Sequence, residues 1–143
     1  MGVNEGSRIE LDVTGIAHGG VAVARYDGRV VFVADAIPGE RVIARVSDDR
    51  KSSFWRAETV EVLEASPDRV EHIWREAAID REPGNRAGGA EFGHIALPRQ
   101  RALKTEVLID SLRRFGKIER DVTVEAVPGD DDRGGLGWRT RVR

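Results

Sequence analysis

The chain has 143 residues, of which 34% are charged and 40% hydrophobic, and its formal net charge is −2. This composition is that of a soluble globular chain with one ordinary domain, or a small domain plus an appendage, and it excludes disorder over the whole length. The absence of cysteine excludes disulfides, thiolate metal sites and a cysteine nucleophile.

The first 66 residues carry β-strand patterns throughout. Alternating or β-rich runs occur at residues 8–13, 21–26, 29–33, 41–46 and 54–63. Asp27-Gly28 is a hairpin signal, because both positions tolerate a positive φ, and Ile37-Pro38-Gly39-Glu40 supplies another turn. Five short strands joined by tight turns predict a small closed barrel of the oligonucleotide-binding type over residues 1–66.

The remaining chain changes character twice. Residues 67–97 contain clustered glycines and no regular period, which predicts a loop or linker. From Pro98 the spacing becomes helical, and Gly116 is the expected C-cap. The expected apolar stripe of this helix consists of Ala102, Val107, Leu108, Ile109, Leu112 and Phe115. Residues 122–127 and 138–143 have strand patterns, so residues 98–143 are expected to be a helix and the incomplete start of a further β region.

Basic and aromatic residues gather around two turns of the expected barrel. Single-stranded RNA is bound by aromatic faces that stack on bases and by cations that contact phosphates. Residues 1–66 carry 8 Lys and Arg against 11 Asp and Glu, so RNA contact must come from such local groups and not from bulk attraction. The predicted RNA-binding residues are Arg25, Arg29, Phe32, Arg50, Lys51, Phe54, Trp55 and Arg56; in the alternative, the aromatic residues fill the barrel and the arginines are solvated.

Other motifs favour simpler interpretations. Gly19-Gly20 and Gly88-Gly89 lack the following helix that a phosphate-binding loop requires, and Asp130-Asp131-Asp132 lacks the spacing of a calcium loop. The histidines His18, His72 and His94 are far apart in sequence, which predicts hydrogen-bonded or solvated imidazoles and no metal site. No arrangement of catalytic residues is recognisable in the chain.

The order of motifs resembles one known family. Residues 8–66, with the segment TGIAHGGVAVAR at 14–25 and IPGE at 37–40, resemble a TRAM domain, the RNA-binding barrel of bacterial RNA uracil-5-methyltransferases. Ser66–Glu71, Gln100–Lys104 and Gly137–Val142 are similar to later segments of the same family. The resemblance implies RNA as the partner, either ribosomal or transfer RNA, and S-adenosylmethionine as the cofactor of the complete enzyme.

The resemblance also has a point of departure. Many family members hold a [4Fe–4S] cluster with cysteines after the barrel, including a Cys-Gly-Gly-Cys element, and this chain has Ala87-Gly88-Gly89-Ala90 there. Alanine has no ligand atom, so the cluster is not expected, and the segment should pack by ordinary contacts or be mobile. The family's catalytic residues match no position here.

The leading hypothesis is therefore the RNA-recognition N-terminal part of an RNA uracil-5-methyltransferase whose catalytic domain is absent from this chain. A protein-interaction or structural barrel that does not bind RNA is the main alternative, and a free-standing RNA-chaperone barrel is a third. The polar start Met1–Glu10 is no secretory signal, and no apolar stretch approaches the about 18 residues of a membrane helix, so a cytoplasmic protein without a membrane partner is expected.

Overall fold

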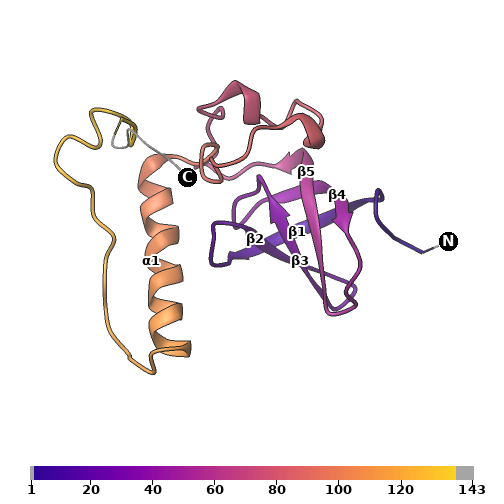
Figure 1. The fold of residues 1–143 in the computed structure, drawn as a ribbon, viewed down its shortest axis with the longest axis horizontal. Coiled ribbons are helices and arrows are strands. Elements are labelled where there is room, and N and C mark those ends of the chain that lie inside the picture. Colours follow the sequence, from indigo (N-terminus) through magenta and orange to yellow (C-terminus); the bar gives the residue numbers. More distant parts are fainter. Residues whose placement is uncertain (1, 138–143) are drawn as a thin grey trace. The chain divides into compact units, whose positions relative to one another are not determined.

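The computed structural model describes residues 2–137, which divide into two compact units, one up to Ile95 and one from Ala96 onward. The first unit contains five strands wrapped into a closed barrel (Figure 1). They are β1 (Arg8–Ile16), β2 (Ala22–Tyr26), β3 (Arg29–Ala34), β4 (Arg41–Asp48) and β5 (Phe54–Glu64). The predicted mainly β fold with a five-stranded barrel is thus confirmed.

The strands follow one another around the barrel in the order β1-β2-β3-β5-β4. All pairings are antiparallel except β3 with β5, which is parallel and closes the barrel. The predicted hairpin between β2 and β3 is confirmed, with φ of 52° at Asp27 and 77° at Gly28. A turn with positive φ at both central residues matches the twist of the strands, which explains the Asp-Gly pair.

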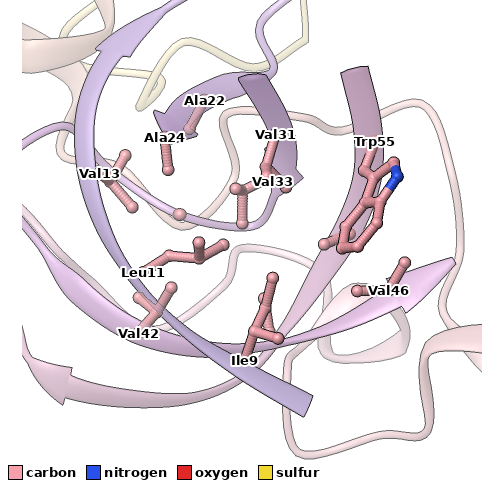
Figure 2. Packing of buried hydrophobic residues seen from close by; sticks show 13 residues of the cluster. Ile9, Leu11, Val13, Ala22, Ala24, Val31, Val33, Val42, Val46 and Trp55 are labelled. Atoms are coloured by element: carbon pink, nitrogen blue, oxygen red, sulfur yellow. The ribbon is translucent and has the colours of Figure 1, made fainter. Parts of the chain in front are cut away.

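Alternation along each strand separates the core from the surface. Most inward side chains are small or β-branched, and the interior shown in Figure 2 includes Ile9, Leu11, Val13, Ala22, Ala24, Val31, Val33, Val42, Val46 and Trp55. Trp55 is the largest of them and is 7% exposed. Because the core is narrow, alanines face the interior at Ala22 and Ala24 where bulkier neighbours need space.

A buried carboxylate ties the barrel to the chain that follows it. Glu40, in the turn before β4, is 1% exposed, and its two oxygens accept hydrogen bonds from the backbone N–H groups of Ile37 and Ser66. The Arg69 guanidinium donates to both oxygens, with Nε 2.6 Å from Oε2 and Nη2 2.8 Å from Oε1. Arg69 Nη2 also donates to the Asp35 carbonyl oxygen.

Residues 67–95 are folded onto this anchor. They contain two short 3-10 helices, Arg75–Ala77 and Pro83–Asn85, and Arg69 forms a β-bridge with Ile95. Arg86 donates to Asp35 Oδ2 and to the carbonyl oxygens of Ile79 and Arg81. The segment was expected either to pack by ordinary contacts or to be mobile. The structure shows it packed, mainly through hydrogen bonds and ion pairs of polar side chains.

Up to residue 137, where the described part ends, the second unit contains one helix, α1 (Leu97–Arg114), and three details correct the sequence-based predictions. Leu103 is fully buried, whereas Leu108 and Phe115 of the predicted stripe are 41% and 81% exposed. The chain after the helix contacts its first half through Arg101 with Asp130 and through Thr105 with the Val124 N–H, and it reaches the second half through Glu119 with Arg113. These contacts leave Leu108 and Phe115 exposed.

The other two corrections concern the end of the helix and the expected strand. Phe115 is the C-cap, and the positive φ of 56° falls at Lys117 and not at Gly116. Residues 122–127 form no strand, because no described segment pairs with them. Asp130 and Asp131 pair with Arg101 in an acidic turn, and the strand expected at 138–143 lies outside the described residues. Within the part of the chain that the structure describes, no helix has both the length and the apolar character needed to cross a membrane.

We predict that Glu40→Gln lowers the free energy of unfolding by about 3–5 kcal/mol, because it leaves the buried Arg69 charge without a counter-charge. Urea unfolding followed by circular dichroism measures the change. Glu82→Gln is the matched control, since Glu82 pairs with Arg45 at the surface, and its effect should stay within about 1 kcal/mol. A loss below about 1 kcal/mol for Glu40→Gln would contradict the anchoring role.

Candidate nucleic-acid interface

The outer face of β2, β3 and β5 gathers most of the predicted RNA-binding residues. Phe32 lies opposite Arg56 in the parallel β3–β5 register, and Val30 lies opposite Phe54. Arg25 of β2 is the register partner of Val30. Residues in register share a face, and because Val31, Val33 and Trp55 point inward, these residues point outward.

The side chains on this face contact one another closely. The Phe32 and Phe54 ring centroids are 5.5 Å apart with an interplanar angle of 66°. Arg56 Cζ lies 5.6 Å from the Phe32 centroid and 5.8 Å from that of Phe54, and Lys51 Nζ lies 5.3 Å from the Phe54 centroid. We call Arg25, Phe32, Lys51, Phe54 and Arg56 the aromatic–basic platform. Its three cations form no ion pair with any described residue, so they are available to phosphates.

Trp55 and Arg29 lie apart from the other predicted RNA-binding residues. Trp55 belongs to the core, where its ring is stacked with Tyr26 at 6.3 Å, so the alternative in which an aromatic residue fills the barrel holds for this residue. Arg29 Cζ lies 4.0 Å from the Trp55 ring centroid, and its Nε donates to the Ser52 carbonyl oxygen. Arg29 therefore caps the end of the core, and these two residues are not part of the platform.

Arg50 is held within its own turn. Its guanidinium donates to both Asp48 oxygens, at 3.0 and 2.7 Å. The hydrogen bonds from Arg50 lower the pKa of Asp48 to about 2 and the same pairing raises the pKa of Arg50. Since the pair stays charged at neutral pH and is internally neutralised, Arg50 contributes less to RNA attraction than Lys51 beside it.

The structure brings together two histidines that are distant in sequence. His72 and His94 are buried with ring centroids 6.2 Å apart, and one ligand atom each of His72, His94 and Asp35 lies within 4.8 Å of the others. The sequence spacing of 22 residues between the histidines gave no sign of this pair. His18, in contrast, is exposed in a turn.

The hydrogen bonds of this cluster already engage most of its ligand atoms. His72 Nδ1 accepts the Trp74 N–H, and its Nε2 lies 3.2 Å from the Ala90 carbonyl oxygen. His94 Nε2 lies 3.0 Å from the Ala36 carbonyl oxygen, and Asp35 pairs with Arg86. Only His94 Nδ1 is buried without a partner among the described residues. A metal would have to displace the backbone from His72 and compete with an arginine for Asp35, so the cluster suits fastening of the segment 67–95 better than metal binding.

Comparison with known proteins identifies the barrel and a set of relatives. Residues 2–63 match the TRAM domain family. An uncharacterized RNA methyltransferase of Bifidobacterium longum is 42% identical over 93% of this chain and 31% of its own length. A 23S rRNA (uracil(1939)-C(5))-methyltransferase of Methylococcus capsulatus is 35% identical over 94% of this chain and 28% of its own length.

A solved structure is similar over a shorter stretch. The solution structure of a conserved Methanococcus maripaludis protein is 36% identical, covers 41% of this chain and 81% of that protein, and has a TM-score of 0.38. Compared with the two methyltransferases named above, this chain spans between 28% and 31% of their length.

We predict that acid destabilises the first unit partly through His94. Burial lowers the pKa of His94 below its ordinary value of 6.5, although the Ala36 carbonyl opposes the shift. The unfolded chain therefore takes up a proton near pH 6.5 that the folded chain resists, so the stabilisation is complete above that pH and is lost as the pH falls below it.

The measurement is urea unfolding at pH 7, 6 and 5. His94→Gln keeps a donor for the Ala36 carbonyl oxygen but cannot titrate. The free energy of unfolding of this variant should therefore fall less steeply with acid than that of the wild type, and the two slopes should differ by up to about 1.4 kcal/mol per pH unit. If the stability of the wild type and of the variant fell in parallel with pH, titration of His94 would be refuted as a cause of the acid destabilisation.

Proposed function

With residues 2–63 forming a TRAM domain in a chain homologous over most of its length to RNA methyltransferases, we propose that this protein is the RNA-recognition N-terminal part of an S-adenosylmethionine-dependent RNA uracil-5-methyltransferase. Its partner is a ribosomal or transfer RNA, and it works in the cytoplasm. The observation that carries the proposal is the aromatic–basic platform on the outer face of β2, β3 and β5.

The platform supplies both components of single-strand binding. Phe32 and Phe54 offer ring faces and edges to bases, a contact worth about 1–3 kcal/mol per base. Arg25, Lys51 and Arg56 lie around the rings and can neutralise phosphates. Because the rings project from paired strands of a closed barrel, little ordering of the backbone is required on binding.

We propose a division of labour along the chain. Residues 1–66 serve recognition, residues 67–97 connect, and residues 98–143 begin the methyltransferase region. The proposal places the S-adenosylmethionine site and the catalytic residues outside this chain, which spans between 28% and 31% of the length of the two methyltransferases. Alanines at 87 and 90 leave no cysteine ligand for an iron–sulfur cluster, and the contacts of Arg86, His72 and His94 support the same segment instead.

A second candidate function is a protein-interaction barrel without RNA contact. The observation in its favour is the charge of residues 1–66, which is −3 from 8 basic and 11 acidic residues. A negatively charged module repels RNA at long range, so RNA binding requires that the local cations of the platform outweigh the overall charge.

We predict that Arg25→Ala, Lys51→Ala and Arg56→Ala together weaken binding of a uridine-containing RNA hairpin with an unpaired loop by at least about tenfold at 0.1 M salt. Loss of three phosphate contacts should also reduce the magnitude of the slope of log K against log salt by about 2. Fluorescence anisotropy with a labelled hairpin, between 0.05 and 0.3 M salt, measures both quantities.

The matched control is Arg41→Ala. Arg41 lies on β4, where it pairs with Glu10 and Glu64, so its removal should leave the RNA affinity within about twofold of the wild type. If the triple variant bound RNA as tightly as the wild type, or if the folded wild type bound none, the protein-interaction function would be the better conclusion.

A third measurement tests the division of labour. The 143-residue chain should transfer no methyl group from S-adenosylmethionine to uridine-containing RNA, because the proposal places the catalytic residues outside this chain, which also offers no cysteine as a nucleophile. Incorporation of labelled methyl groups into RNA above a no-protein background would contradict this part of the proposal.

A further inference from the structure

The angle between the two platform rings limits how many bases they can hold. Consecutive bases in a stacked single strand are parallel, so two side chains that stack on neighbouring bases must present nearly parallel faces. The Phe32 and Phe54 rings are inclined by 66° with centroids only 5.5 Å apart. A base stacked on one ring is therefore steeply inclined to the other ring, and an edge-to-face contact of that kind is one that aromatic rings favour.

The strand register ends the aromatic surface after this one pair. Phe32 and Phe54 are diagonal neighbours on β3 and β5, since their register partners are Arg56 and Val30. The next outward positions along the two strands are Val30, Ala34 and Glu58, none of which is aromatic. Glu58 also places a negative charge at one end, where the phosphates of a continuing strand would pass.

The cations fit the same small ligand. Arg56 Cζ is almost equidistant from the two ring centroids, at 5.6 and 5.8 Å, and Lys51 Nζ lies on the Phe54 side at 5.3 Å. Two cations beside one ring pair match the two phosphates that flank a single nucleotide. We propose that the platform binds one unpaired nucleotide, unstacked from its neighbours, as in a bulge or a loop of a folded RNA. This inference rests on the proposed function and specifies its ligand.

The test compares the 143-residue protein with Phe32→Leu, Phe54→Leu and the double variant, because leucine keeps apolar bulk but has no ring face. The probes are an RNA hairpin with one bulged 2-aminopurine, the same hairpin without the bulge, and a single strand carrying two adjacent 2-aminopurines. Thermal unfolding by circular dichroism confirms that each variant is folded. Affinities come from anisotropy, and quenching of 2-aminopurine reports stacking on a ring.

If both rings hold one base, each single variant should lose at least about fivefold in affinity for the bulged hairpin, and the double variant should be within about twofold of the weaker single variant. The bulged hairpin should bind more tightly than the other two probes, with quenching of its 2-aminopurine. Multiplied losses in the double variant, or tighter binding of the single strand with both of its probes quenched, would overturn the one-nucleotide site while leaving RNA binding intact. Failure of the wild type to bind any of the three RNAs would overturn the proposed function itself, and this inference with it.

Discussion

The buried ion pair between Glu40 and Arg69 is the constraint on which the first unit depends. A carboxylate at 1% exposure is tolerated only when its charge is balanced and its lone pairs are engaged, and Glu40 meets both conditions with donors from Ile37, Ser66 and Arg69. These donors come from the turn between β3 and β4, at Ile37, and from the chain just after β5, at Ser66 and Arg69. The pair therefore fixes the turn before β4 and the exit from β5 at the same point, and the bonds of Arg86 and His94 to Asp35 and Ala36 extend the same junction.

With that junction fixed, the parallel pairing of β3 with β5 both closes the barrel and builds its outer face. Alternation along β5 sends Trp55 into the core and its neighbours Phe54 and Arg56 outward. The register then brings Phe32 beside Arg56. One strand thus contributes both the largest core side chain and the centre of the platform. When Phe54 or Arg56 is substituted, a loss of RNA binding must therefore be distinguished from a change in the packing of Trp55.

The sequence was sufficient for features that depend on local chemistry. Alternation and the Asp27-Gly28 turn predicted the five strands, and the clustering of basic and aromatic residues near positions 25–32 and 50–56 pointed to the platform. Features that depend on distant partners were not predictable: the role of Glu40, whose counter-charge is 29 residues away, and the meeting of His72 with His94. The strand predicted at 122–127 is not formed for the same reason, because a β-rich run becomes a strand only where another strand pairs with it.

Charge distribution bears on how selective the proposed RNA platform can be. Several arginines of the barrel are engaged locally, Arg41 with Glu10 and Glu64, Arg45 with Glu82, and Arg50 with Asp48. The other five basic residues of residues 1–66 form no ion pair among the described residues, and three of them, Arg25, Lys51 and Arg56, belong to the platform of a module whose net charge is negative. Such a surface gains little from counterion release along a duplex, since only a few phosphates can be contacted at once. If the platform binds RNA as proposed, its affinity comes mainly from a base that has already left its stack, and the barrel then recognises the shape of the RNA more than its total charge.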